Sequence, residues 1–126
     1  LPGPTPEIWA EYAAARIFVI PSSYESFGLA TAEALAAGLP AIGFADCAGT
    51  NELIQHGVNG LLVDPADRVR NLGSAIDRLI EAPSERSRLA TAARASSKGL
   101  AVEDVADRWE QLFEKVRRNR LHPPIG

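Results

Sequence analysis

Two glutamates stand eight positions apart in the stretch PSSYESFGLATAEALAAG, residues 21–38. Glu25 precedes a Ser-Phe-Gly turn, and Glu33 is the only charged residue of the Ala- and Leu-rich run that follows. That run predicts a helix from about Gly28 to Ala37, with Gly38 as its C′ residue. On such a helix Glu33 shares its face with Leu29, Ala30, Ala36 and Ala37. A carboxylate among small residues can accept two strong hydrogen bonds from a vicinal diol, such as that of ribose.

The Ser-Phe-Gly turn adds a second kind of chemistry at the start of the same helix. It would present the backbone N–H groups of Phe27, Gly28 and Leu29, which lack intrahelical partners and lie at the positive end of the helix dipole. Gly28 has no side chain to obstruct an anion, so a phosphate could bind there. A phosphate site and a diol site one to two turns apart together predict a nucleoside diphosphate. Glu25 would then face whatever is attached to the β-phosphate.

Structural interpretations of the same residues remain open at this point. Ser22-x-x-Glu25 matches a capping box, which would give both residues a purely local role. Two glutamates eight apart also occur by chance, and a single Glu on an Ala-rich helix can mark its wet edge.

The rest of the chain predicts an alternation of short strands and helices. Short apolar runs predict buried strands at 16–20, 40–44 and 61–63, and Asn59-Gly60 predicts a turn. Helices are expected at about 6–15, 28–37, 50–55, 65–82, 84–99 and 102–118. Their expected caps are Thr5, Thr50, Asp64 and Ser84. One apolar face of the helix after Asp64 is expected to hold Val69, Leu72, Ile76, Leu79 and Ile80.

This alternation predicts the α/β class, with a Rossmann-like parallel sheet and helices on both faces. Doubly wound sheets usually have five or six strands, so three strands suggest the C-terminal half of a nucleotide-binding domain. We expect the other strands before Leu1, and the absence of any Met fits a fragment. The expected organisation is a partial domain over residues 1–116, with its closing helix at about 102–118, and a polar tail at 119–126. An unpaired first strand, RIFVI, would also permit self-association through the sheet edge.

Composition excludes several classes of function. The net charge is −3, which gives no reason to expect a nucleic acid partner. No apolar run approaches the ~18 residues of a membrane span. Cys47 is alone and only two His are present, so neither an internal disulfide nor a zinc site is expected. We therefore expect a cytoplasmic protein; Arg117, Arg118 and Arg120 leave open a peripheral contact with the cytoplasmic membrane face.

Several other residues have a structural and a functional interpretation. Glu52, in a helix's first turn, is expected to be structural rather than a donor contact. Cys47 could be a reactive thiol, but no neighbouring cation in the sequence would activate it. His56 is expected to be solvated, and Trp9 and Trp109 are expected in the core.

Three stretches, PSSYESFGLATAEALAAGLPAI, AGTNELI and GVNGLLVDPAD, follow one another in an order that resembles a known family. They are similar to the C-terminal half of retaining GT-B glycosyltransferases of glycosyltransferase family 4. The signature of that family is two glutamates separated by seven residues, with Phe-Gly shortly after the first. Here these residues are Glu25, Phe27-Gly28 and Glu33, and the resemblance runs from about Glu7 to Val116.

The resemblance implies transfer of a hexosyl group from a nucleoside-diphosphate sugar to an acceptor hydroxyl, with retention of configuration and without metal or other cofactor. It implies Glu33 as the ribose ligand and Glu25 as the catalytic residue facing the donor sugar. The implied substrate-binding residues are Glu25, Ser26, Phe27, Gly28, Leu29 and Glu33. An acceptor glycan, lipid or small molecule would be bound mainly by an N-terminal domain outside this sequence.

The sequence also departs from the family pattern. The Arg and Lys with which the family grips the diphosphate are absent, and a common Gly-Gly pair is Ala48-Gly49 here. We therefore expect the isolated chain to be inactive. A non-catalytic nucleotide-sugar-binding or interaction module of the same fold is the alternative. A dinucleotide-dependent oxidoreductase is disfavoured because no G-x-G-x-x-G is present.

Overall fold

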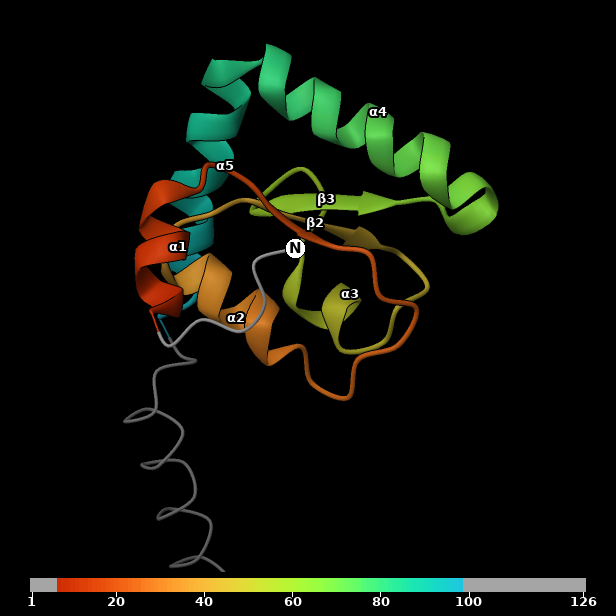
Figure 1. Ribbon diagram of the computed structural model, residues 1–126, viewed down its shortest axis with the longest axis horizontal. Helices are drawn as coiled ribbons and strands as arrows, with labels where there is room; N and C mark the ends of the chain where they lie inside the picture. The colour runs from red at the N-terminus through yellow and green to blue at the C-terminus, as the bar shows by residue number, and fades with distance from the viewer. Residues whose placement is uncertain (1–6, 99–126) are drawn as a thin grey trace, which may run out of the picture.

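The computed structural model describes residues 7–98 and shows a small parallel sheet flanked by helices (Figure 1). Its strands are β1 (Phe18–Ile20), β2 (Ala41–Phe44) and β3 (Gly60–Val63). Its helices are α1 (Ile8–Ala14), α2 (Leu29–Ala36), α3 (Thr50–Leu53), the 3₁₀ helix η1 (Pro65–Asp67), α4 (Arg68–Glu81) and α5 (Pro83–Ser96).

The sheet confirms the predicted α/β class. Its order is β1-β2-β3 and both pairings are parallel, with Phe18 opposite Ala41 and Ile42 opposite Leu61. Each strand is a short apolar run, and β2 is buried along its whole length, as parallel strands covered on both faces usually are. Because the strands are parallel, the loops that leave their carboxyl ends meet at one edge of the sheet.

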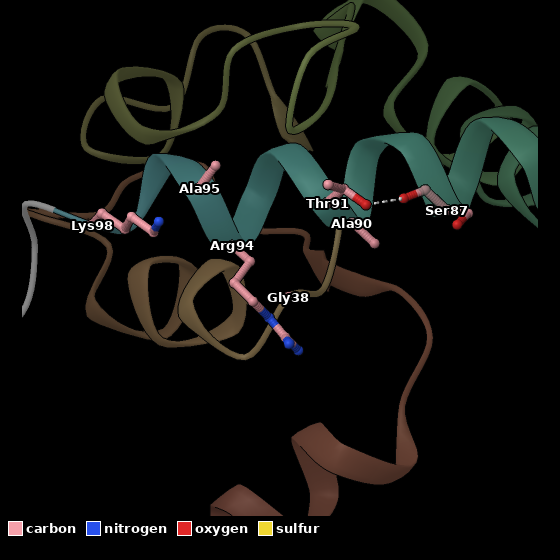
Figure 2. A pocket seen from close by; sticks show the side chains of 7 residues that line it. All are labelled: Gly38, Ser87, Ala90, Thr91, Arg94, Ala95 and Lys98. Atoms are coloured by element: carbon pink, nitrogen blue, oxygen red, sulfur yellow. Dashed lines mark hydrogen bonds between the residues drawn. The ribbon is translucent and has the colours of Figure 1, made fainter.

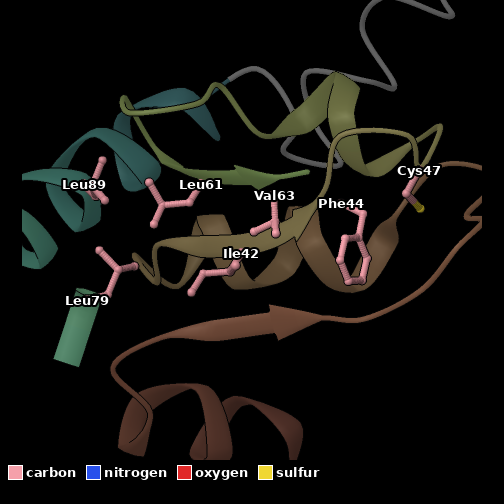
Figure 3. Close-up of a cluster of buried hydrophobic side chains, with 7 residues drawn as sticks. All are labelled: Ile42, Phe44, Cys47, Leu61, Val63, Leu79 and Leu89. Atoms are coloured by element: carbon pink, nitrogen blue, oxygen red, sulfur yellow. The ribbon is translucent and has the colours of Figure 1, made fainter. Parts of the chain in front are cut away.

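The larger core cluster lies between the sheet and α4, and Figure 3 shows its side chains. Ile42 and Leu61 point from neighbouring strands toward Leu79 of α4 and Leu89 of α5, and both leucines are fully buried. The full set of buried residues is Ile42, Phe44, Cys47, Leu61, Val63, Leu79 and Leu89. This cluster anchors α4 on one face of the sheet.

The opposite face carries α2 and α3. Leu35 of α2 and Ile54 after α3 pack with Ala41 and with Ala93 of α5, so α5 contributes to the core on both faces. Gly43 lets α3 approach β2 closely, because a Cβ there would lie 2.5 Å from the Cγ2 atom of Thr50. The predicted arrangement of helices on both faces is therefore confirmed.

The helix caps were predicted with mixed success. Asp64 caps only the short η1, accepting a hydrogen bond from the Ala66 N–H. The N-cap residue of α4 itself is Asp67, which accepts from the Arg70 N–H. Gly38 follows the end of α2 with φ +82°, as predicted. The expected caps at Thr50 and Ser84 are wrong. Thr50 is fully buried and accepts the Cys47 thiol, so the N-cap position of α3 falls on Gly49. Pro83 already has helical φ and starts α5, which moves the N-cap position to Ala82.

Three predicted core residues are exposed instead. Val69 is 87% exposed and Ile80 57%, since they lie about 80° and 100° around α4 from the buried Leu79. Helix α4 therefore buries a narrower stripe than its apolar pattern suggests. Trp9 is also exposed (58%), although its ring makes an edge contact with that of Tyr12.

The predicted Asn59-Gly60 turn also differs in detail. Gly57, with φ +74°, makes the turn, and Gly60 already belongs to β3. Asn59 is fully buried, and its side chain bonds the Gln55 N–H, the Leu53 carbonyl and the Ser96 hydroxyl. Asn59 therefore holds the turn against α5 through its side-chain hydrogen bonds.

Other predictions fall outside the described residues: the Thr5-Pro6 helix start, the helix at 102–118 with Trp109, and the tail at 119–126. Within residues 7–98, no helix has both the length and the apolarity to cross a bilayer.

Candidate functional site

Two loops meet at the carboxyl edge of the sheet, where the sequence predicted a ligand. Residues 21–28 leave β1 and residues 45–49 leave β2, and the backbone of Gly49 lies directly against the first loop. A Cβ at Gly49 would be 2.5 Å from the Glu25 carbonyl oxygen and 3.2 Å from the Phe27 nitrogen. The second loop therefore supports the first and sets the position of the predicted Glu25–Gly28 turn.

The start of α2 has no side-chain cap. Gly28 is its N-cap residue, with φ +78°. The first backbone bond of the helix runs from the Ala32 N–H to the Gly28 carbonyl at 3.0 Å, so the N–H groups of residues 29–31 have no intrahelical acceptor. The free N–H groups lie slightly later in the chain than the predicted set at 27–29, because the helix begins at Leu29 rather than Gly28. The capping-box alternative, Ser22 with Glu25, is wrong for this helix.

The side chains around this helix start are accessible. Phe27 is 51% exposed and Leu29 68%, and Ser26 is exposed as well. Glu25 is half-buried, and among the described residues its carboxylate has neither a hydrogen bond nor an ion pair. A half-buried carboxylate without a partner retains its capacity to accept hydrogen bonds from a ligand.

Glu33 lies on the open face of α2, as predicted. Ala30 and Ala36 on the same face are exposed, while Glu33 itself is half-buried. Its Oε2 atom accepts a hydrogen bond of 3.2 Å from the hydroxyl of Tyr12 in α1. Burial, and secondarily this bond and the Glu33 charge, raise the pKa of Tyr12 above its ordinary value of 10.0. The structure thus places Glu25 in the loop before α2 and Glu33 on α2, and the two carboxylates share no hydrogen-bond partner among the described residues.

Tyr12 was missed by the sequence analysis. It is separated from Glu33 by 21 positions and lies on a different helix, so no spacing rule joins them. The only available signal was a tyrosine among apolar residues, whose hydroxyl needs a partner when it is buried.

The loop after β2 is fixed mainly by its own contacts. Asn51 donates from Nδ2 to the Ala45 carbonyl at 2.8 Å, and Arg68 pairs with Asp46. Cys47 is fully buried, with its thiol directed to Thr50 and the Ala48 carbonyl, so it is a core residue and not an accessible nucleophile. Glu52 is exposed in the first turn of α3, which fits its structural interpretation.

His56 is exposed but has a partner that the sequence did not predict. Its Nδ1 atom accepts a hydrogen bond of 3.0 Å from the N–H of Leu62 in β3. Across residues 7–98, no group of three or more His, Cys, Asp or Glu side chains is placed to hold a metal ion.

A separate hollow of about 510 Å³ lies near the other end of α2, and Figure 2 shows the residues that line it. Arg94 reaches from α5 to Gly38, and one of its guanidinium nitrogens donates to the Ala37 carbonyl at 3.1 Å. Because this hollow adjoins the loop entering β2, it lies at the amino edge of the sheet, away from Glu25 and the start of α2. None of the predicted site residues lines it.

The family, the curated relatives and the solved structures that match this chain agree with one another. Residues 1–96 match the family described as "Glycosyl transferases group 1". The chain is 36% identical over 122 residues to an exopolysaccharide phosphotransferase of Streptomyces coelicolor, covering 96% of this chain and 13% of that protein. It is 41% identical over 121 residues to a D-inositol 3-phosphate glycosyltransferase of Frankia alni, covering 96% of this chain and 28% of that protein.

Two solved structures have the same fold. Sucrose-phosphate synthase from Thermosynechococcus elongatus superposes with a TM-score of 0.78 at 34% identity, over 86% of this chain and 27% of that one. HepE of Anabaena, solved in complex with UDP, superposes with a TM-score of 0.71 at 28% identity, over 86% and 29%. The chain thus spans less than a third of the length of these proteins.

The sheet, its uncapped helix start and these similarities define a domain of the GT-B glycosyltransferase type. The chain belongs to the glycosyl transferases group 1 family.

Proposed function

We propose that this chain is the donor-binding part of a retaining glycosyltransferase of family 4. The whole protein would move a hexosyl group from a nucleoside-diphosphate sugar to an acceptor hydroxyl. The observation that carries the proposal is the uncapped start of α2 at the carboxyl edge of the sheet, followed by half-buried Glu33 on the same helix. The UDP complex of HepE supports this choice of ligand, since that protein shares the fold.

Each group at the site would have a distinct role. The N–H groups at the start of α2 would bind the diphosphate. Gly28 itself is buried against Gly49 and Leu53, and it supplies the left-handed backbone of the turn before the helix. Glu33 would accept hydrogen bonds from the ribose hydroxyls. Glu25, whose carboxylate has no partner among the described residues, would face the donor sugar, with Ser26, Phe27 and Leu29 lining the approach.

The chemistry that follows is electrostatic. As the bond from the anomeric carbon to the β-phosphate oxygen breaks, positive charge develops on the sugar ring and negative charge on the departing diphosphate. The acceptor oxygen forms the new bond to the anomeric carbon, and its proton would pass to the departing phosphate oxygen. The positive end of α2 would stabilise the diphosphate, and the Glu25 carboxylate would stabilise the ring. These groups are fixed before the reaction, because Gly49 supports the turn that carries Glu25. The acceptor would be held by a part of the protein outside this chain, and we propose that the protein acts in the cytoplasm or at the cytoplasmic membrane face.

The test of this proposal is nucleotide binding by the intact protein. Titration calorimetry with UDP, GDP and ADP should identify one that binds, and Glu33→Gln should weaken it. The amide keeps the shape of the side chain but loses its charge, at a cost of about 1.5–3 kcal/mol for a charged hydrogen bond. Glu81→Gln is the matched control, because Glu81 is exposed at the end of α4 and distant from the site in sequence and element. Equal affinity of the wild type and Glu33→Gln would eliminate Glu33 as the ribose ligand.

Glu25→Gln should separate binding from transfer. We expect the nucleoside diphosphate to bind almost as before, because Glu25 would face the sugar and not the nucleotide. Transfer from a labelled nucleotide sugar should fall by orders of magnitude, and NMR of the remaining product should show a retained anomeric configuration. Binding without transfer by the wild-type protein, over a broad set of sugars and acceptors, would favour the non-catalytic binding module instead.

A further inference from the structure

The hydrogen bond from Tyr12 to Glu33 joins the proposed ribose ligand to a helix that the family signature does not include. We propose that Tyr12 is a positioning residue, which fixes the Glu33 carboxylate in the orientation that accepts the ribose diol. This inference rests on the proposed function and adds a residue to the same site.

Tyr12 is a rigid anchor for this purpose. It is 8% exposed and packs with Ala34 and Leu39 from the end of α2 and the segment beyond it. The Trp9 and Phe18 rings contact it edge-on, at centroid distances of 5.7 and 6.2 Å. A tyrosine has few rotatable bonds, and these contacts hold the hydroxyl at one point beside α2.

Glu33 needs such an anchor more than most carboxylates do. Its side chain has three rotatable bonds, and its neighbours on the helix face are three alanines and Leu29, which is itself 68% exposed. Among the described residues, its side chain has no hydrogen-bond or ion-pair partner besides Tyr12. Without that bond the carboxylate would sample several rotamers, and a ligand would have to select one of them.

The bond also leaves the acceptor capacity that a diol requires. A carboxylate has two oxygens with about four acceptor positions, and Tyr12 occupies one of them on Oε2. The remaining positions can accept two ribose hydroxyls. Because Tyr12 is a neutral donor, it orients the carboxylate without neutralising the charge that strengthens those bonds.

The competing interpretation is purely structural: Glu33 would only satisfy the buried Tyr12 hydroxyl. The two interpretations differ in what the Tyr12→Phe substitution changes. The phenylalanine ring preserves the contacts with Trp9 and Phe18 and removes the hydroxyl alone. A structural role predicts lower stability with no selective effect on a ligand, whereas a positioning role predicts weaker binding only of ligands that Glu33 contacts.

The experiment measures nucleotide affinity in the intact protein by calorimetry. It uses the ribonucleoside diphosphate that binds best and its 2′,3′-dideoxy analogue, which has no hydroxyls for Glu33. Tyr12→Phe should weaken the ribonucleotide about three- to tenfold, the range expected for one hydrogen bond, and leave the dideoxy analogue unchanged. In a Glu33→Gln background the same substitution should have a smaller effect on the ribonucleotide.

The outcomes separate this inference from the proposed function. Unchanged ribonucleotide affinity in Tyr12→Phe, or an equal loss for both ligands, would overturn the positioning role while leaving donor binding intact. Failure of every nucleoside diphosphate to bind the wild-type protein would overturn the proposed function, and the positioning role with it.

Discussion

Gly49 illustrates how a single residue without a side chain can determine the geometry of a site. Its backbone, at φ +78°, lies against the Glu25 carbonyl and the Phe27 nitrogen. The Ala48-Gly49 pair therefore keeps a glycine at the position where the two loops touch. The residue that replaces the first glycine of the family's Gly-Gly pair is Ala48, and its side chain is exposed.

Gly49→Ala should lower both stability and nucleotide affinity. The strained backbone costs about 1–3 kcal/mol for a residue with a Cβ, and the new atom would push the Glu25 turn away. Gly57→Ala is a matched control, because Gly57 has φ +74° but a Cβ there meets no atom within 4 Å. Thermal melting and calorimetry should show both variants destabilised and only Gly49→Ala impaired in binding. Normal affinity in Gly49→Ala would show that the two loops are not coupled at the site.

Tyr12 gives the protein a specific alkaline sensitivity. Its pKa is raised in the folded state, chiefly by burial and then by Glu33, so the folded protein holds the phenolic proton more tightly than the unfolded chain does. Its stabilising contribution is complete below pH 10.0, the ordinary pKa, and is lost as pH rises from there through the folded value.

Denaturant unfolding from about pH 8 to about pH 11 should therefore show a fall in stability that Tyr12→Phe reduces. Other groups that titrate in this range are common to both proteins, so the difference between the curves isolates Tyr12. Parallel curves would mean that the hydroxyl titrates alike in the folded and unfolded states.

At the scale of elements, the corner between α4 and α5 depends on arginine. Arg86 of α5 donates from one nitrogen to the Leu79 and Ile80 carbonyls, at 2.6 and 3.2 Å, which satisfies the last turn of α4. Arg78 and Glu85 also form a two-point pair across the corner, and this arginine lowers the pKa of the Glu85 carboxyl. The corner thus fixes Leu79 and Leu89 in the shared core.

Arg86→Leu should destabilise the protein by about 1–3 kcal/mol, because the carbonyls at the end of α4 lose a charged donor. Arg70→Leu should stay within about 0.5 kcal/mol of wild type, since the exposed Arg70 side chain has no hydrogen bond or ion pair with the described residues. Urea unfolding of both variants measures the difference. If Arg86→Leu and Arg70→Leu were equally stable, apolar contacts alone would stabilise the corner between α4 and α5.

The elements that the sequence predicted well are those with local causes. Pro21 ends the apolar run of β1, and Asp64-Pro65 starts a helix through its own backbone geometry. The predictions that failed are the cap at Thr50 and the burial of Val69 and Trp9. They failed for one reason: whether each side chain is buried depends on which other elements pack against its helix. The candidate site is similar: the turn at Gly28 follows from a glycine that can adopt positive φ, and the face that carries Glu33 follows from helix periodicity. The supports from Gly49 and Tyr12 depend on contacts between elements distant in sequence.

At the scale of the whole molecule, the two edges of the sheet differ. On the outer side of β3, the Leu62 N–H is bound by His56 and the Gly60 carbonyl by the Gly57 N–H, at 3.0 and 2.8 Å. β1 is the edge strand of the sheet within residues 7–98: it pairs with β2 on one side, and no described strand lies on its other side. The Phe18 N–H bonds the Pro40 carbonyl toward β2, so the alternation of the strand directs the Val19 N–H outward.

The 126-residue chain alone should therefore self-associate through β1. Val19→Pro removes the outward N–H without removing a bond to β2, as prolines on edge strands do, and should lower the association. Light scattering over a range of concentrations measures the mass. A wild-type chain that stays monomeric would show that the β1 edge is protected by residues outside 7–98.

His56→Ala provides the opposite test at β3. It removes the acceptor of the Leu62 N–H and should increase association, because an unpaired edge invites another strand. An unchanged mass would indicate that the backbone bond of Gly57 is sufficient to protect this edge.

The outer backbone groups of β3 are already bonded by the turn that precedes it. A further strand, from the same polypeptide or another, is therefore expected to add to the sheet beside β1. A strand supplied on a separate polypeptide would join the sheet along β1, next to the loop that carries Glu25. This makes β1 the position at which strands from another protein can be added in a chimera.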